Sequence, residues 1–417
     1  MHKITHLHAR EILDSRGNPT IEVDLSLGDY LATASVPSGA STGRHEAHEL
    51  RDGNPTRYSG LGVLQAVNHV NEEIKKHLLG GAFDQEGLDQ TLIELDGTAT
   101  KERLGANSLL GVSMAFARAQ ALSQKQELYL YLGERSSNSN FKLPTPLVNV
   151  INGGKHADSG LDIQEFMIIP KGIKLFRNKV RISAEIFHTL KNILQSKDYT
   201  VGVGDEGGFA PHLATNEQAL DLLTEAITSA GYTTSQIHLG FDAAASSFYK
   251  DNVYHLQASH PPRKLSSTQL ISWYRKLSEN YSLMFLEDGL AEDDWAGFRE
   301  LTAKLGQQLV VVGDDLTVTN TERINEASRQ QAINAVLIKL NQIGTVTETL
   351  AAIKRTQELS WVPIISHRSG ETTDTFIADL AVGSGAPYIK AGSMSRGERI
   401  AKYDRLLEIE EQLGADA

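Results

Sequence analysis

The chain has 417 residues, a formal net charge of −12 and a pI near 5.6, with 40% hydrophobic and 22% charged residues. A chain of this length is expected to form two domains, one of them large, and this composition is typical of a soluble globular protein. The acidic balance argues against nucleic acid and anionic membranes as partners, and the lack of cysteine excludes disulfides and thiolate catalysis. The N-terminus has no signal-peptide pattern and the apolar stretch 109–117 is too short to span a bilayer, so we expect a cytoplasmic protein.

The first third of the chain begins with three strand-like segments and continues with helical patterns. The turn sequences DSRGNP and GD separate the strand-like segments, which span residues 4–13, 20–27 and 30–36. The small and polar segment VPSGASTG, residues 36–43, is typical of a mobile loop. Helical periodicity follows in three further segments, at about residues 60–79, 84–95 and 105–133. The last of these is rich in small residues, as in a buried helix, and together the elements predict an α+β domain at residues 1–135.

Beyond a linker-like segment rich in Ser, Asn and Pro, residues 136–146, apolar strand-like runs alternate with helical patterns to the C-terminus. Each run ends in polar or charged residues, at Glu206, Asp242, Glu287, Asp314, Lys339, His367 and Lys390. The separations range from 23 residues (367 to 390) to 45 residues (242 to 287), which fits one βα unit each with longer excursions in the first two intervals. Repeated βα units predict an α/β fold with a TIM-type barrel at residues 144–417, in which the strand ends share one mouth.

Lys339 follows AVLI, a run apolar enough for a strand that is buried on both faces. It is a candidate general base, because Mg²⁺ and Lys390 nearby would lower its pKa; the alternative is a strand-end lysine whose amine reaches solvent. Asp242, Glu287 and Asp314 offer oxygen ligands from three consecutive strand ends, which favours Mg²⁺ before Ca²⁺ or Mn²⁺. Each carboxylate taken singly is more simply a cap of the helix that follows. Their combination with a strand-end lysine points to a catalytic metal site.

Glu206 lies in the sequence GDEGG and is a candidate acid across the mouth from Lys339, or a turn residue without a role. His367, Arg368 and Ser369 offer a hydroxyl and a planar guanidinium suited to phosphate, with a solvated loop as the alternative. The glycines around GDEGG match the dinucleotide-binding pattern G-x-G-x-x-G. The two acidic residues inside the pattern would repel a pyrophosphate and no helix follows at once, so we exclude a dinucleotide site.

Many segments of the chain resemble those of the enolases (phosphopyruvate hydratases), in the order in which that family has them. The segments are DSRGNPT, VPSGASTG, NGGKHAD, DIQEFM, GDEGG, LEDGL, AEDDW, GDDLTVTN, KLNQIGT, SHRSGET and IKAGSMSR. The forms LEDGL and GSMSR are similar to those of bacterial members. The resemblance extends from end to end, and it implies an α+β domain followed by a barrel that begins ββαα before its regular βα units.

The resemblance implies reversible dehydration of 2-phospho-D-glycerate to phosphoenolpyruvate in glycolysis and gluconeogenesis, with two Mg²⁺ ions per active site. It implies Lys339 as the base and Glu206 as the acid, with Glu165 in support of the acid. The other implied catalytic and substrate-binding residues are His156, Gln164, His367, Arg368, Ser369 and Lys390. The implied metal ligands are Asp242, Glu287 and Asp314 for one ion and Ser41 for the second.

Members of this family are dimers, in some cases octamers built from dimers, and the resemblance places Arg10, Glu22 and the C-terminal helix near the dimer contact. Glu408 replaces an arginine that is common in the family and that would pair with the Glu22 position. The like charge would weaken this contact. We expect a homodimer or a higher assembly, and the sequence leaves the choice between dimer and octamer open.

Two other functions stay open at this point. The first is a metal-dependent acid-sugar dehydratase or racemase of the same superfamily. The phosphate-binding trio of Ser41, Arg368 and Ser369 distinguishes the two, and its presence in this chain favours an enolase. A protein that has lost catalysis, such as an adhesion factor or a lens-type protein, would lack catalytic residues, and each expected one is in place. The sequence carries no signal for or against an additional cell-surface or secreted pool, or membership of an RNA-degrading assembly.

Overall fold

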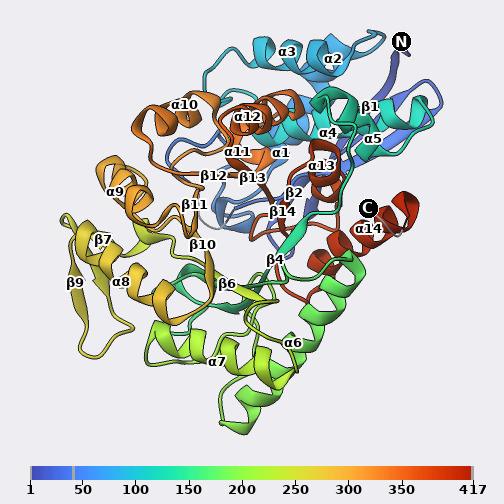
Figure 1. Ribbon diagram of the computed structural model, residues 1–417. Helices are drawn as coiled ribbons and strands as arrows, with labels where there is room; N and C mark the ends of the chain where they lie inside the picture. The colour runs from blue at the N-terminus through green and yellow to red at the C-terminus, as the bar shows by residue number, and fades with distance from the viewer. Residues whose placement is uncertain (1, 40–42, 415–417) are drawn as a thin grey trace.

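The computed structural model describes residues 2–39 and 43–414, and the first part of the chain forms the expected meander (Figure 1). Its antiparallel sheet consists, in chain order, of β1 (Ile4–Leu13), β2 (Pro19–Leu27) and β3 (Tyr30–Ser35). The turn between β1 and β2 closes because Oδ1 of Asp14 accepts hydrogen bonds from the backbone amides of Arg16, at 2.8 Å, and Asn18, at 2.9 Å. The strands predicted from the sequence are confirmed.

Helices follow this sheet, and α4 (Ala106–Ser123) makes the most extensive contact with it (Figure 1). They are α1 (Leu64–His69), α2 (Lys75–Leu78), α3 (Gln85–Asp96), α4 (Ala106–Ser123) and α5 (Leu128–Ser136). The single helix predicted at residues 105–133 is wrong, because the chain turns at Lys125, where φ is +54°, and α5 begins anew. The predicted burial of α4 is confirmed. Gly111 lets α4 approach β2, since a Cβ there would lie 2.6 Å from the side chain of Val23.

The second part of the chain is a closed barrel, so the predicted fold class is confirmed. Around the barrel the strands follow the order β10 (Leu283–Glu287), β11 (Val310–Gly313), β12 (Ala335–Ile338), β13 (Val362–Ser366), β14 (Tyr388–Lys390), β4 (Thr145–Asn152), β5 (Glu165–Ile169) and β6 (His238–Asp242). The strand β5 is antiparallel to both of its neighbours, and the other pairs are parallel. Two strands and two helices come first and regular βα units follow, as the resemblance implies.

Helices surround the barrel strands (Figure 1). They are α6 (Phe176–Ser196), α7 (Asn216–Ser229), α8 (Ser267–Asn280), α9 (Trp295–Leu305), α10 (Thr321–Gln330), α11 (Leu340–Ile343), α12 (Val346–Glu358), α13 (Phe376–Ser384) and α14 (Gly397–Leu413). Across all the residues that the structure describes, none of the helices has the length and apolar character needed to cross a membrane.

Two intervals between the predicted strand ends differ from a plain βα unit. The excursion between β6 and β10 contains a small antiparallel sheet of β7 (Tyr249–Lys250), β8 (Val253–Leu256) and β9 (Arg263–Leu265). The strand predicted to end at Glu206 is wrong, because residues 201–209 form a loop between α6 and α7. This loop touches the barrel through an isolated bridge from Phe209 to Ile151. Glu206 therefore reaches the barrel end from a connection rather than from a strand.

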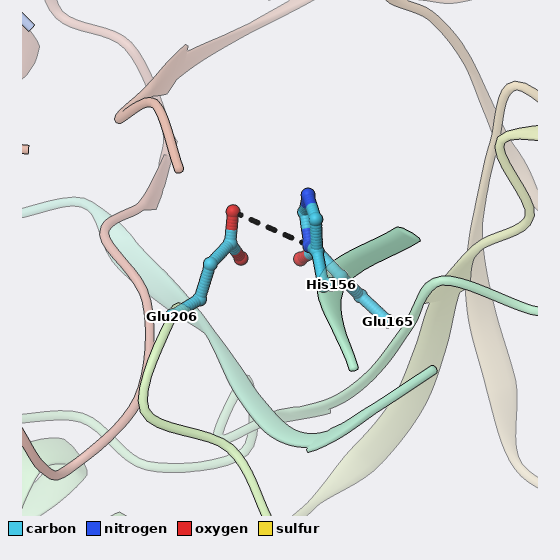
Figure 2. Close-up of side chains that lie close together, drawn as sticks. All are labelled: His156, Glu165 and Glu206. Carbon is cyan, nitrogen blue, oxygen red and sulfur yellow. Dashed lines mark ion pairs between the residues drawn. The ribbon is translucent and has the colours of Figure 1, made fainter. Parts of the chain in front are cut away.

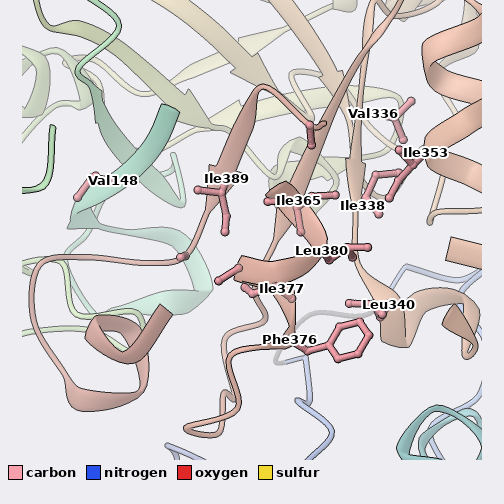
Figure 3. Packing of buried hydrophobic residues seen from close by; sticks show 14 of the residues in the cluster. Val148, Val336, Ile338, Leu340, Ile353, Ile365, Phe376, Ile377, Leu380 and Ile389 are labelled. Atoms are coloured by element: carbon pink, nitrogen blue, oxygen red, sulfur yellow. The ribbon is translucent and has the colours of Figure 1, made fainter. Parts of the chain in front are cut away.

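The strand β12 shows how the barrel core is divided. All of its residues are buried, as predicted, and they alternate between two apolar clusters. Ala335 and Leu337 belong to the cluster that fills the barrel interior, whereas Val336 and Ile338 pack outward, toward Ile353 of α12 (Figure 3). Because the interior is filled with side chains, the polar residues at the strand ends are left to form the mouth.

Candidate active site

The register of three neighbouring strands brings three carboxylates side by side at the barrel mouth. Asp242, the last residue of β6, pairs with Glu165 of β5 on one side and with Glu287 of β10 on the other. Because β5 is antiparallel to β6, its first residue lies at the end where β6 and β10 finish. All three carboxylates are buried. Residues far apart in the sequence thus become neighbours through strand pairing.

Lys390, the last residue of β14, supplies positive charge to this group. Its Nζ donates to the two carboxylate oxygens of Glu287 at 2.9 and 3.0 Å, and it lies 3.1 Å from Glu165 and 3.5 Å from Asp242. Burial opposes the charge on Lys390, but these carboxylates outweigh burial, so its pKa is raised well above the ordinary value. Burial and the charge of Asp242 raise the pKa of Glu287 well above its usual range. One ammonium is thus shared by three carboxyl groups.

Lys339 follows β12 and contacts Asp314, which follows β11. Its Nζ donates to Oδ2 of Asp314, and its backbone amide donates to Oγ1 of Thr319 at 2.9 Å. Gln342 donates to the other oxygen of Asp314, also at 2.9 Å. Burial opposes the charge on Lys339, but the nearby carboxylates, Asp314 foremost, together outweigh burial, so the pKa of Lys339 is raised. The sequence led us to expect a lowered pKa. Among the protein's own groups, however, Asp314 raises the pKa of Lys339 by more than Lys390 lowers it.

Glu206 is held in its loop by backbone and side-chain contacts. The backbone amide of Ser393 donates to the carbonyl of Glu206 at 3.0 Å. The next residue, Gly207, has a φ of +89°, and a Cβ there would lie 2.7 Å from the carbonyl oxygen of Ser395, so the loop needs glycine at this point. The side chain of Asn149, on β4, donates to Oε2 of Glu206 at 3.0 Å. The loop therefore places the side chain of Glu206 at the mouth, where the ends of strands place the other acidic side chains.

His156 lies between two acids (Figure 2). Its Nδ1 is 3.6 Å from Oε1 of Glu165 and 3.6 Å from Oε1 of Glu206, and it has no hydrogen-bond partner among the described residues. Burial lowers the pKa of His156, so the ring is neutral at pH 7. Burial and the charge of Glu206 raise the pKa of Glu165 well above its usual range. Glu165 is therefore the carboxyl group of this cluster that retains a proton.

His367, Arg368 and Ser369 follow β13 and are buried, so the alternative of a solvated loop is wrong. Arg368 donates to the carboxylate of Glu46 through Nη1 at 2.9 Å and through Nη2 at 3.3 Å. Nε2 of His367 lies 3.4 Å from Oε2 of Glu206. Burial lowers the pKa of His367 to about 3, so this ring is also neutral at pH 7. The guanidinium of Arg368 and the rings of His156 and His367 line the same cavity.

One cavity collects most of the residues predicted from the sequence. Those that line it are His156, Gln164, Glu165, Glu206, Asp242, Asp314, Lys339, His367, Arg368, Ser369 and Lys390. Glu287 is bound to Lys390 outside this lining, and Ser41 lies outside the described residues. The convergence of strand ends on one mouth, which the repeated βα pattern predicts, is found in the structure.

Sequence reasoning missed several residues that hold the site together. Asp288 accepts hydrogen bonds from the backbone amides of Asp314 and Asp315, both at 2.9 Å. Arg399, on α14, donates to Nδ1 of His367 at 2.7 Å. Asp288 follows a strand end directly, so its place in the sequence was an available signal. Arg399 lies in an ordinary helical pattern, and only the tertiary structure brings it to the site.

Carboxyl groups outnumber cationic side chains in the lining of the cavity, as expected of a site for divalent cations. Six carboxylates and three cationic side chains line it, and the pKa values of both histidines are lowered. In residues 2–39 and 43–414, two groups of side chains have possible ligand atoms within 4.8 Å of one another. The first group is His156, Glu165 and Glu206, and the second is Asp288, Asp314 and Asp315. Of the predicted ligands only Asp314 belongs to these groups. The donor set, rich in carboxylate oxygens, fits a hard cation such as Mg²⁺.

Comparison with known proteins covers both parts of the fold. The family model described as "Enolase, N-terminal domain" matches residues 4–132, and that described as "Enolase, C-terminal TIM barrel domain" matches residues 140–417. Enolase 1 of Methylococcus capsulatus is 53% identical over 418 aligned residues, which cover 100% of this chain and 98% of that protein. The similarity thus includes each segment that lines the cavity.

Proposed function

Because the chain belongs to the enolase family, we propose that the residues around this cavity carry out the family's reaction in the roles that the resemblance implies. The protein is a phosphopyruvate hydratase, which reversibly dehydrates 2-phospho-D-glycerate to phosphoenolpyruvate in glycolysis. The reaction removes a proton from C2 and the hydroxyl from C3. It therefore needs a base, an acid, and groups that bind the phosphate and the carboxylate of the substrate.

Lys339 is the proposed base that takes the proton from C2. It accepts a proton only as a neutral amine, so the contact between its ammonium and Asp314 must be given up before the transfer. After the transfer, the negative charges of Asp314 and Glu287 stabilise the ammonium that forms. The side chain of Lys339 is only 14% exposed, which limits the access of water to the amine.

Glu206 is the proposed acid that protonates the departing C3 hydroxyl, with Glu165 and His156 in support. The raised pKa of Glu165 keeps a proton within this cluster at neutral pH. One oxygen of each acid lies 3.6 Å from Nδ1 of His156, so the proton has a short path between the two carboxyl groups. Two adjacent buried carboxyl groups that hold one proton are suited to act as an acid near pH 7.

Substrate binding is assigned to the cationic and polar side chains of the cavity. Arg368 and Ser369 would bind phosphate, for which the planar guanidinium fork is suited. Lys390 would contact the substrate carboxylate, and its raised pKa keeps it charged. His367 and Gln164 complete the proposed contacts. Oε1 of Gln164 is buried and has no hydrogen-bond partner in the described part of the chain, so it can accept from a substrate hydroxyl.

Enolases use Mg²⁺, and we propose two ions per active site in this protein. Asp242, Glu287 and Asp314 would hold the first, and Ser41, outside the described residues, would join the second with the substrate phosphate. When bound, the ions would offset the negative charge that develops on the substrate as C2 loses its proton. The support for this assignment is the excess of buried carboxylates over cationic side chains around the cavity.

We further infer a homodimer, with assembly into octamers left to experiment, that acts in the cytoplasm. Arg10 and Glu22, implied by the resemblance at the dimer contact, form an ion pair on the N-terminal sheet. Leu13 and Leu31, on strands of the same sheet, are 55% and 56% exposed. A partner surface would cover such apolar side chains. The division into domains at residues 1–135 and 144–417 also stays a proposal.

The observation that carries the proposed roles is the meeting of Lys339, Glu206 and Arg368 at one buried cavity. The test follows the ultraviolet absorbance of the enol product after 2-phosphoglycerate and Mg²⁺ are added to the purified protein. Lys339→Ala and a chelator should each abolish the rise. The matched control is Lys304→Ala, an exposed lysine of α9 that should leave the rate unchanged. A normal rate for Lys339→Ala would refute its role as the base.

A further inference from the structure

Arg399 is a fully buried guanidinium whose hydrogen bonds all go to neutral acceptors, and the carboxylate of Glu398 lies 3.4 Å from its Nε. Nη1 donates to Nδ1 of His367 at 2.7 Å and to the carbonyl oxygen of Arg368 at 2.6 Å. Nη2 donates to the carbonyl oxygens of Asp205 at 3.0 Å and Ser369 at 2.6 Å. Burying an arginine on neutral acceptors opposes stability, because desolvation of its charge is only partly offset. An arginine in this position calls for a reason beyond folding.

The contact with His367 determines which ring nitrogen carries the proton. A guanidinium has only donors, so Nδ1 of His367 must accept and cannot itself be protonated. The ring is neutral, since burial lowers its pKa to about 3, and its one proton therefore lies on Nε2. Arg399 thus selects the Nε2–H tautomer of His367.

This tautomer determines how Glu206 is contacted. Nε2 of His367 lies 3.4 Å from Oε2 of Glu206, close enough for its N–H to stabilise charge on that oxygen, although the two atoms are not aligned as a hydrogen bond. Asn149 donates to the same oxygen at 3.0 Å. Oε2 therefore accepts one hydrogen bond and lies beside the protonated nitrogen of His367, which makes it the poorer place for a proton. Oε1, which lies 3.6 Å from Nδ1 of His156, is left as the oxygen that can carry the proton.

We propose that Arg399 is a positioning residue for the dehydration step, which selects the Nε2–H tautomer of His367 and so reserves Oε1 of Glu206 for the transferred proton. The inference rests on the role of Glu206 as the acid proposed above. The described residues that line the cavity do not include Arg399, so it acts through His367 rather than on the substrate.

The backbone around Arg399 is shaped to receive it. Gly392 has a φ of +88°, and a Cβ there would lie 2.6 Å from Cδ of Arg399. The four hydrogen bonds of Arg399 join the loop that carries Glu206 to the segment 367–369. A purely structural role would therefore also predict some loss of activity when Arg399 is replaced. The test must separate the tautomer from loop packing.

The helix α14 offers a matched control. Lys402, one turn after Arg399, is also fully buried, and it donates to Glu371 at 2.8 Å and to the carbonyl of Thr372 at 2.6 Å. The variants are Arg399→Met, which removes the donors, Arg399→Lys, which keeps the charge without the planar fork, and Lys402→Met. Lys402→Met removes a buried cation from the same helix but leaves the contact with His367 intact.

Three readouts are compared in the full-length protein with Mg²⁺. Long-range ¹⁵N spectra of labelled histidine report which nitrogen of His367 is protonated. Exchange of the C2 proton of 2-phosphoglycerate with solvent reports the step assigned to Lys339. Formation of phosphoenolpyruvate reports the whole dehydration, which also needs Glu206. In Arg399→Met we expect the loss of the Nε2–H signature and a fall in dehydration on the order of 10- to 100-fold, with a much smaller fall in C2 exchange.

The outcomes distinguish this inference from the roles proposed above. The inference is overturned if His367 keeps its Nε2 proton in both Arg399 variants. It is also overturned if C2 exchange and dehydration fall by the same factor, as in Lys402→Met, because that is the result of a packing defect. It is overturned as well if the tautomer changes while dehydration is unaffected, because dehydration then does not depend on the tautomer that Arg399 selects. Should Arg399→Met fail to fold, Arg399→Lys carries the same test.

Discussion

Replacing Lys390 with methionine tests how the charges of the barrel mouth are balanced. Lys390 is only 2% exposed, and its Nζ lies 2.9 to 3.5 Å from oxygens of Glu165, Asp242 and Glu287. Methionine keeps most of the length and packing of the stem but removes the ammonium. Three buried carboxylates then lose the cation that they share.

The expected loss of stability follows from this geometry. Removing one partner of a buried ion pair costs about 3–5 kcal/mol, because the other charge is left uncompensated. The fold can reduce the loss by taking up protons, since burial already raises the pKa values of Glu165 and Glu287. A carboxyl group whose pKa is raised on folding contributes stability at low pH that is lost as the pH rises through that pKa. The deficit of the variant should therefore grow with increasing pH.

The measurement is urea unfolding of wild type and Lys390→Met in a chelator, at about pH 8 and about pH 5.5. We expect a deficit of about 3–5 kcal/mol at the higher pH and a clearly smaller one at the lower pH. The matched control is Lys304→Met, which breaks an exposed pair with Glu300 at 2.6 Å and should change stability by less than about 1 kcal/mol. A deficit for Lys390→Met that equals the control, or that shrinks as the pH rises, would refute the reasoning.

Three further predictions concern other parts of the molecule. Glu408→Arg should lower the dissociation constant of the dimer about two- to fivefold, because it removes the like charge opposite Glu22. The substitution also removes the hydrogen bond that Glu408 accepts from Arg405 at 3.0 Å. An unchanged dissociation constant in sedimentation equilibrium would contradict this prediction. Gly207→Ala should destabilise the fold by about 1–3 kcal/mol, because φ is +89° there and the new Cβ would meet the carbonyl of Ser395. Urea unfolding measures this loss of stability, and an unchanged midpoint would show that the loop relaxes freely. Burial lowers the pKa of Lys179 to about 8, so its charged form destabilises the fold below that pH and the penalty fades as the pH rises toward about 10.5. Lys179→Met should therefore raise the free energy of unfolding by about 1–2 kcal/mol near pH 7 and have less effect near pH 10.5, and the opposite trend would exclude burial as the cause.

Much of the barrel could be predicted because strand burial leaves a local trace. The run at residues 335–338 is apolar throughout since one face fills the barrel interior and the other faces helices, and the polar residue that follows then marks a strand end. The same reasoning misplaced Glu206, because VGVG has the apolar pattern of a strand but lies in a loop that glycine backbone geometry shapes. It also merged α4 and α5, since a turn at Lys125 leaves no break in helical periodicity.

The sequence by itself determined that the residues at the strand ends, such as Asp242, Lys339 and Lys390, meet at the mouth, because alternation of strands and helices brings strand ends to one side of a barrel whatever the details of packing. The tertiary structure alone decided which charge pairs with which. Lys339 contacts Asp314 whereas Lys390 contacts Glu165, Asp242 and Glu287, and Arg399 reaches His367 from the last helix. Electrostatic interactions and hydrogen bonds depend on distances of a few ångströms and on burial, and neither quantity can be read from separation along the chain.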